Sequence, residues 1–335
     1  MIKGQLKAIS LNLFLFLVST ILILLIAESF VRIAGYRGKY ELEEKEQLDW
    51  QYKTKKTHNS MGYHDYEYST EKPKGTFRIY VLGDSYTYGQ GIKMTETYPK
   101  FLEKFLNEKY PSKHFEVINS SFLGLDTKRE LERLKDKGLK LSPDMVILGY
   151  CLNDPSGDSG ATQWREEEKK EKIKALFNNK TLLRVSHFYW FLKVKAEAIY
   201  FNARIFTRTF LKLYDKDSKE WKDFEKSFNN ICKLTKENDI PLLVIIFPYF
   251  YQLNENYPFF KAHSMVKDLC VENNVRVLDL LGFYKGMPDK SLWVKTTIPA
   301  NTHPNAKAHR IAAAEIFKEI VKSHYFKINK YLETN

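Results

Sequence analysis

The sequence has little cysteine, and what it has is scattered. Its three cysteines, Cys151, Cys232 and Cys270, are odd in number and lie far apart in a chain of 335 residues. A disulfide framework and a zinc site both require closer or more regular spacing, so neither is predicted and no metal is expected. We expect the three thiols to be buried as small hydrophobic side chains. They do not indicate a redox compartment.

Internal repeats and low-complexity tracts are also absent from the sequence. The composition, with 44% hydrophobic and 28% charged residues, is that of an ordinary globular protein. The length allows either one large core with insertions or two small domains. The aromatic content of 15% is high and suggests broad apolar or sugar-facing surfaces.

Acidic residues are fewer than basic ones, and the formal net charge is +12. Such a balance favours anionic partners, whether nucleic acid, acidic glycans or lipid headgroups. In the stretch 166–174, however, lysines are interleaved with glutamates, a pattern typical of solvated helix faces rather than of a binding groove. We therefore expect no nucleic-acid partner and interpret the excess charge as lysine-rich surface.

One long apolar run stands near the N-terminus, from Ile9 to Ala27, preceded by Lys3 and Lys7. As a helix it would span about 28 Å, roughly the hydrocarbon thickness of a bilayer. A cleaved signal peptide has a shorter apolar region and a small-residue cleavage site, which is not found here. We predict an uncleaved, single-pass membrane anchor through residues 9–27. The rest of the chain is expected outside the cytoplasm, in the cell envelope, although basic residues after the run blur the charge asymmetry.

We divide the chain into three segments. Residues 1–35 are the predicted anchor, residues 36–75 a polar and aromatic linker with an edge segment, and residues 76–325 the main domain. A charged, mostly helical insertion is expected at 155–235. Its aromatic stretch Leu182–Tyr200 suits either a lid over a substrate site or a helical layer packed on the core, and we favour the layer.

From residue 77 onward, short apolar runs alternate with helical patterns. Apolar spacing of i, i+3, i+4 predicts a helix over residues 98–106, and another is expected over Lys128–Lys137, ended by Gly138. The alternation predicts a three-layer α/β/α sandwich with a parallel, flavodoxin-like sheet. The runs have the length and branched side chains of buried strands, and they are Phe77–Leu82, Phe115–Ile118, Met145–Leu148, Leu242–Phe247 and Val275–Leu280.

Four positions follow predicted strands, and the last of them also precedes a helix that we predict to carry Pro304 in its first turn. Each alone has an ordinary explanation: a strand-to-loop turn, a turn glycine, an Asx turn or helix cap, and a lone histidine. Together they carry more weight, because open α/β sheets bind their ligands at the carboxyl ends of the strands. They provide a nucleophile, two oxyanion donors and a base, the set that acyl transfer requires. The residues are Ser85, Gly124, Asn153 and His303.

Their order along the chain resembles that of the SGNH (GDSL-like) hydrolases, over about residues 59–322. The resemblance implies that Ser85 is the nucleophile and His303 its general base. It also implies an oxyanion hole made of the backbone N–H groups of Ser85 and Gly124 and the side-chain amide of Asn153. It implies no metal and no organic cofactor.

Two short motifs, Asn59–Tyr63 and Thr97–Pro99, look like those of the membrane-anchored, cell-envelope members of that family. The sequence departs from the family three positions before His303, where Ala300 stands in place of the usual aspartate. That aspartate normally orients the imidazole. Asn301 is the nearest polar residue that can take its place.

The resemblance implies a serine esterase that hydrolyses an acyl ester, such as an acetyl ester, on an envelope glycan or lipid. Two alternatives remain open. The first is an O-acyltransferase acting on an envelope polysaccharide. The second is a non-catalytic glycan-binding protein with the same fold, which the missing carboxylate favours.

Overall fold

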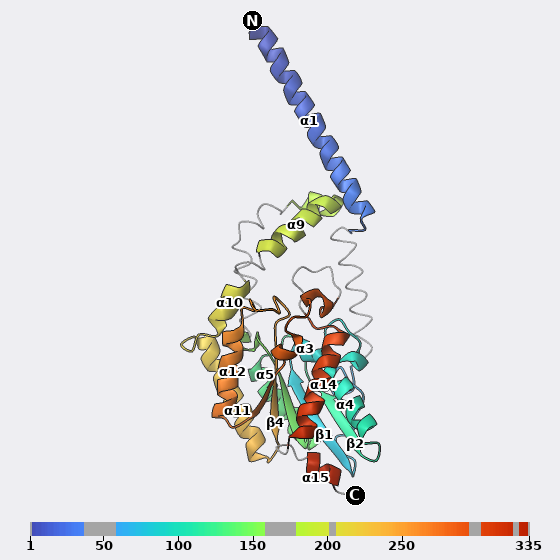
Figure 1. Cartoon of the computed structure of the whole chain (residues 1–335), viewed down its shortest axis with the longest axis vertical. Coiled ribbons are helices and arrows are strands. Elements are labelled where there is room, and N and C mark those ends of the chain that lie inside the picture. Colours follow the sequence, from blue (N-terminus) through green and yellow to red (C-terminus); the bar gives the residue numbers. More distant parts are fainter. Residues whose placement is uncertain are drawn as a thin grey trace.

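The predicted strands form one parallel sheet, shown in Figure 1. The computed structural model describes residues 2–36, 58–157, 179–200, 206–294, 303–323 and 328–333. Within them, the strands are β1 (Thr76–Gly83), β2 (His114–Asn119), β3 (Met145–Cys151), β4 (Leu242–Phe247) and β5 (Arg276–Asp279). Their spatial order is β2-β1-β3-β4-β5, and every neighbouring pair is parallel. This is the flavodoxin-like order, so the predicted fold class is confirmed.

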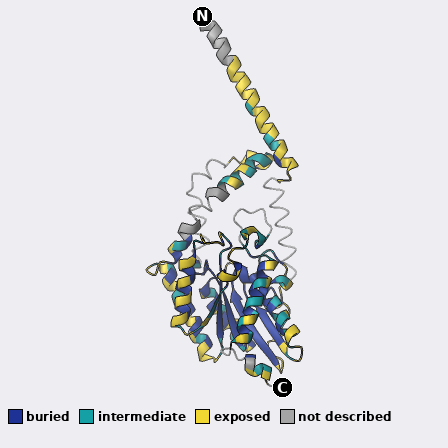
Figure 2. Ribbon diagram, viewed as in Figure 1, coloured by how far each residue is buried: buried dark blue, intermediate teal, exposed yellow. Residues whose placement is uncertain are grey.

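The central strands are buried along their whole length, as continuous apolar runs of branched residues require. Helices cover both faces of the sheet (Figure 2). On one face, α4 (Tyr98–Lys109) packs against α14 (Ala306–Lys322). The other face carries α5 (Thr127–Arg133), α11 (Lys219–Glu237) and α12 (Phe260–Glu272). The described residues also form the helices α3 (Ser85–Tyr88), α8 (Lys180–Val185), α9 (His187–Tyr200), α10 (Phe206–Leu213), α13 (Leu281–Tyr284) and α15 (Ile328–Glu333).

Gly138 does not end the helix in which it lies. After α5 the chain continues as a π turn and a 3-10 turn, and the helical conformation stops only at Ser142, whose φ is 49°. Gly138 is needed for packing instead, because a Cβ there would lie 2.7 Å from the ring of Tyr80. The glycine lets this helix approach β1 closely.

α1 (Ile2–Ile33) extends away from the sheet domain and is largely exposed (Figures 1 and 2). Its stretch Leu11–Ile33 has a mean hydropathy of 2.5 and is 6% buried, so by length and composition it can cross a membrane. A membrane anchor and a signal sequence both have these properties.

α8 and α9 cover part of the predicted insertion, and they do not join the layer on the sheet. α9 packs against α8 and against the C-terminal end of α1 (Figure 1). Our preference for a core layer over Leu182–Tyr200 is therefore corrected. The layer is formed by the later helix α11, whose residues Trp221, Phe224 and Phe228 are buried.

Candidate active site

Ser85 begins α3 at the carboxyl end of the central strand β1. α3 lies directly on the strand ends because two paired glycines, Gly83 of β1 and Gly149 of β3, leave room for it. A Cβ would come within 2.1 Å of the Thr87 hydroxyl at Gly83 and within 2.3 Å of it at Gly149. The Asp84 side chain caps the helix by accepting a hydrogen bond of 2.8 Å from the backbone N–H of Tyr86.

The structure brings His303 to Ser85, with 2.8 Å between the imidazole Nε2 and the serine Oγ. This is the separation at which a hydroxyl can give its proton to a neutral imidazole. His303 does not directly follow β5, because α13 and the segment 289–294 lie between them. Its backbone carbonyl accepts a hydrogen bond of 2.9 Å from the N–H of Val294, next to an antiparallel bridge between Trp293 and Pro304.

His303 is only partly exposed, and the ring of Tyr86 lies 5.4 Å from its own. Burial lowers the pKa of His303 to about 4, because the imidazolium loses its hydration there. At neutral pH the ring is therefore uncharged. An uncharged imidazole is the form that can accept the serine proton.

Asn153 follows β3, and its side chain reaches toward the same place. Its carbonyl begins the 3-10 turn Asp154–Ser156, but its side chain does not cap that turn. Instead the amide Nδ2 donates a hydrogen bond of 3.1 Å to Oδ2 of Asp84. An amide nitrogen carries two hydrogens, so one remains for a second acceptor. The ordinary explanation of Asn153 as a cap does not hold in this structure.

Gly124 lies in the loop between β2 and α5, which runs beside the end of β1. Hydrogen bonds from the N–H of Ser120 to the carbonyl of Val81 (3.0 Å) and from the N–H of Phe122 to the carbonyl of Gly83 (3.2 Å) hold that loop. Gly124 itself has a φ of 68°, a conformation that glycine adopts without strain. The four predicted positions thus come from four different segments that meet at the carboxyl edge of the sheet.

Asn301, the residue expected to orient His303, and Ala300, which stands at the usual aspartate position, lie outside the described residues. The described part of the chain shows no group of three or more His, Cys, Asp or Glu side chains placed to hold a metal ion. The three cysteines are buried, as predicted.

Three carboxyl groups lie buried behind the serine: Asp84, Glu130 and Asp154. Burial raises the pKa of Asp84 to about 6, and hydrogen bonds from Tyr86 and Asn153 partly offset the rise. Burial also raises the pKa values of Glu130 and Asp154 well above the usual range, and the charges of the neighbouring carboxylates add to the effect. The charge of Asp84, which accepts the hydrogen bond from Asn153, therefore depends on whether Glu130 and Asp154 are protonated.

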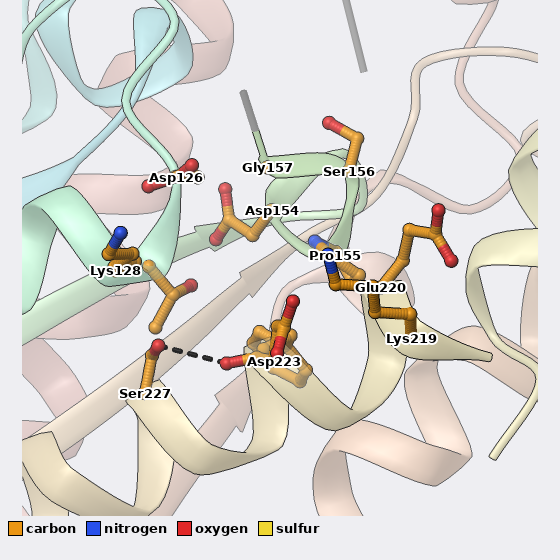
Figure 3. A pocket seen from close by; sticks show the side chains of 12 residues that line it. Asp126, Lys128, Asp154, Pro155, Ser156, Gly157, Lys219, Glu220, Asp223 and Ser227 are labelled. Carbon is orange, nitrogen blue, oxygen red and sulfur yellow. Dashed lines mark hydrogen bonds between the residues drawn. The ribbon is translucent and has the colours of Figure 1, made fainter. Parts of the chain in front are cut away.

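A pocket of about 470 Å³ lies between the start of α5, the 3-10 turn Asp154–Ser156 and the start of α11, and its lining contains neither Ser85 nor His303 (Figure 3). Asp126 and Lys128 line one side of it, and Lys219 and Asp223 of α11 line the other. Its lining is mostly charged or hydroxyl-bearing. Such a pocket suits a ligand rich in hydroxyl groups better than an acyl chain.

Sequence reasoning missed the role of Asp84. The residue is part of the Gly-Asp-Ser motif, but the motif alone does not show which side chain its carboxylate contacts. The contact joins residues 69 positions apart and depends on β1 and β3 being neighbours. A carboxylate directly before a candidate nucleophile was the only available signal.

Three of the solved structures that this chain resembles are esterases, and each is distant in sequence. A two-domain esterase active on acetylated mannans is 14% identical, with a TM-score of 0.46, and the match covers 75% of this chain and 51% of that one, about half its length. An acetylxylan esterase from Geobacillus stearothermophilus is 13% identical, with a TM-score of 0.45 and coverage of 74% and 95%. An esterase from Pseudoalteromonas sp. is 14% identical, with a TM-score of 0.40 and coverage of 73% and 97%.

No curated protein matches the sequence. The GDSL-like lipase/acylhydrolase family, however, matches residues 81–311, which include Ser85, Gly124, Asn153 and His303. This span is more than half of the chain. The chain therefore belongs to the GDSL-like lipase/acylhydrolase family and is an ester hydrolase.

Proposed function

We propose that this protein is a membrane-anchored serine esterase that removes acyl groups, acetyl in particular, from an envelope glycan or lipid. The observation that carries the proposal is the 2.8 Å contact between Ser85 Oγ and His303 Nε2. The N–H groups of Ser85 and Gly124 and the amide of Asn153 are proposed as oxyanion donors. Together they form the set of groups that ester cleavage through an acyl-enzyme requires.

In the proposed mechanism, Ser85 Oγ bonds to the ester carbonyl carbon while its proton passes to Nε2 of His303. The oxyanion donors stabilise the negative charge that develops on the carbonyl oxygen. The C–O bond to the alcohol then breaks, and Nε2 returns the proton to the departing alcohol oxygen. Water attacks the acyl-enzyme in the same way, with His303 as base, and releases the carboxylic acid and the free serine.

Two features of the molecule support an envelope glycan or lipid as substrate. α1 has the length and hydropathy of a membrane span. The carboxyl edge of the sheet, which carries α3, faces the end of the molecule where α1 and α9 lie (Figure 1).

The contacts of α1 favour a retained anchor over a cleaved signal sequence. Glu28 and Arg32 hydrogen bond to residues 185–188 of the domain that follows. A segment removed after export would contribute nothing to the mature fold. We therefore propose that α1 stays attached and holds the domain outside the cytoplasm.

A fluorophosphonate probe tests the mechanism, because it labels only an activated serine. The full chain in detergent should be labelled and should hydrolyse a chromogenic acetyl ester. Ser85→Ala should lose both properties at unchanged thermal stability. Ser120→Ala is the matched control, since Ser120 lies at the same edge of the sheet and its hydroxyl donates to the backbone carbonyl of Val81. Labelling retained in Ser85→Ala would contradict the assignment.

Adding a sugar acceptor to the same assay separates hydrolysis from O-acyl transfer. Hydrolysis releases free acid whether or not the sugar is present, whereas transfer yields an acylated sugar. The proposal that Asn301 orients His303 is tested by Asn301→Ala, which should lower the rate of both reactions.

A further inference from the structure

A cluster of hydrogen bonds, here named the juxtamembrane joint, fixes the end of α1 to the start of α9. The carboxylate of Glu28 accepts from the hydroxyl of Ser186 (2.7 Å) and from the backbone N–H groups of His187 and Phe188 (2.9 Å each). α9 begins at His187, so these are N–H groups that have no partner within the helix. The Glu28 side chain thus caps a helix that lies about 160 residues later in the chain.

The joint continues further along α1, beyond the contacts of Glu28. Arg32 donates a hydrogen bond of 2.9 Å to the carbonyl of Val185, the last residue of α8. The backbone carbonyl oxygen of Tyr36 lies 2.9 Å from Nδ1 of His187, within hydrogen-bond distance. The ring of Tyr36 packs edge-on against Phe191, with 4.8 Å between the ring centroids. Contacts from Glu28 and Arg32 on α1 and from Tyr36, just after its end, fix the direction of α9 relative to α1.

The joint lies at the end of the apolar run. Between Lys7 and Glu28 the sequence contains no charged residue, and the apolar run ends at Ala27. If α1 crosses a bilayer, Glu28 therefore lies at its boundary. Figure 1 shows α9 running across the direction of α1 rather than along it, as a helix in the plane of the membrane would.

α8 and α9 have the composition of a membrane-surface helix. Between residues 179 and 196 there is no acidic residue. Exposed apolar side chains project from the pair, 41% for Leu182, 56% for Val185 and 38% for Leu192. Amphipathic helices that lie in the membrane interface combine basic residues with Trp, Phe and Leu. The basic and amphipathic aromatic residues of the pair are Lys180, Arg184, Lys193, Lys195, Tyr189 and Trp190.

We propose that α8 and α9 lie in the membrane interface beside the end of α1, with anionic lipid headgroups as their partner. The apolar side chains enter the acyl boundary, and the lysines and Arg184 contact the headgroups. The proposal rests on the retained anchor of the proposed function. It goes further in assigning a lipid-binding role to a segment outside the catalytic site.

Trp190 allows a direct test in the full chain reconstituted into bilayers. The bilayers contain phosphatidylcholine and phosphatidylglycerol brominated near the headgroup. The fluorescence of Trp190 is the difference between the emission of the wild type and that of Trp190→Phe. We expect the bilayers to quench most of this difference. Trp221→Phe is the matched control, because Trp221 is buried on α11 in the sheet domain and its emission should not be quenched. Glu28→Gln should reduce quenching of Trp190, since it weakens the cap that holds α9.

Two outcomes separate failure of this inference from failure of the proposed function. If the protein resists alkaline extraction but the emission of Trp190 is not quenched, the anchor is kept and the interfacial placement of α9 is wrong. The placement is also wrong if a second copy of the chain, rather than lipid, covers Trp190. Protein extracted by alkali lacks the anchor itself. Hydrolysis of a soluble ester reports on Ser85 in either case. Lys180→Glu on α8 should leave that hydrolysis unchanged, whereas quenching of Trp190 by the bilayer should fall.

Discussion

The side-chain amide of Asn153 donates a hydrogen bond of 3.1 Å to the carboxylate of Asp84, the residue directly before the proposed nucleophile. With one amide hydrogen held in this way, the other has a fixed direction. If Asn153 is an oxyanion donor as proposed, Asp84 is a positioning residue that acts through it. Its oxygen Oδ1 meanwhile caps α3 through the N–H of Tyr86.

Asp84→Asn should keep the cap, because asparagine caps helices as well as aspartate does. It leaves one acceptor oxygen for the donors Tyr86, Asn153 and Ser85, so the hold on Asn153 weakens. We expect kcat to fall by about 10- to 100-fold with little change in KM, less than the roughly 1,000-fold upper range for losing a donor outright. Steady-state kinetics on a chromogenic ester measure this. A changed KM with unchanged kcat would show that Asp84 acts on substrate binding instead.

The pH profile provides a separate readout of the same relationship. Burial raises the pKa of Asp84 to about 6 and lowers that of His303 to about 4. If the ionised Asp84 is needed to hold Asn153, the acid limb of kcat/KM lies near pH 6 in the wild type. In Asp84→Asn this ionisation is absent, so the limb should move from pH 6 toward the pKa of His303, near 4. Identical profiles for the two proteins would refute the positioning role.

Asp84 contributes to the pH dependence of stability in a definite direction. Burial raises its pKa from 3.8 to about 6, so between these values its carboxyl binds the proton more tightly in the folded chain than in the unfolded chain. The contribution of Asp84 to stability is then greatest below pH 3.8, falls as the pH rises to about 6, and is constant above, whereas the lowered pKa of His303 acts in the opposite direction. The shift corresponds to about 3 kcal/mol. Asp84→Asn should therefore be more stable than wild type at neutral pH and equal to it in acid, as measured by chemical denaturation.

Gly149→Ala should disturb α3 by steric contact alone. The added Cβ would lie 2.3 Å from the Thr87 hydroxyl and 2.5 Å from that of Tyr98. Overpacking of this kind costs about 1–3 kcal/mol, and a displacement of about 1 Å at a catalytic group can cost about 100-fold in rate. Gly282→Ala is the control, since nothing lies within 4 Å of its Cβ, and it should leave activity unchanged. An active Gly149→Ala variant would show that α3 tolerates displacement.

Arg78 should matter far more to stability than another paired arginine, Arg276. Arg78 is fully buried, donates to Glu116 at 2.7 Å and to the carbonyl of Leu141 at 2.8 Å, and its loss would leave a buried carboxylate unpaired. Arg78→Met should cost about 3–5 kcal/mol. Arg276 forms its ion pair with Glu319 at the surface, so Arg276→Met should cost no more than about 1 kcal/mol. Equal losses in thermal unfolding would contradict this reasoning.

The sheet could be predicted from the sequence because its strands are short apolar runs, and burial on both faces leaves little choice of structure. From that topology we predicted that Ser85, Gly124, Asn153 and His303 converge on one edge of the sheet. The contact between His303 and Ser85 agrees with this, while the approach of Gly124 to Ser85 stays a prediction. The path of the chain to His303 could not be predicted, because it depends on an antiparallel bridge between Trp293 and Pro304 with no periodic signal. Gly138 was misinterpreted since a glycine that stops a helix and one that admits a neighbouring ring look alike in sequence.

The position of α9 was also beyond sequence reasoning. An aromatic helix can cover a core, a substrate or a membrane, and its composition is similar in each case. What decides its place is the capping of its first turn by Glu28, a long-range contact. Long-range capping has no local pattern that a sequence shows.

The juxtamembrane joint has a kinetic consequence. If α1 spans the membrane as proposed, the domain tethered to its end samples only a thin shell of space above the bilayer. Substrates attached to the same surface then meet the active site at an effective concentration that reaches roughly the millimolar range for short tethers. An enzyme of this kind needs little intrinsic affinity for its substrate. Its selectivity among esters would arise from the distance of each ester group from the bilayer surface as much as from contacts at Ser85.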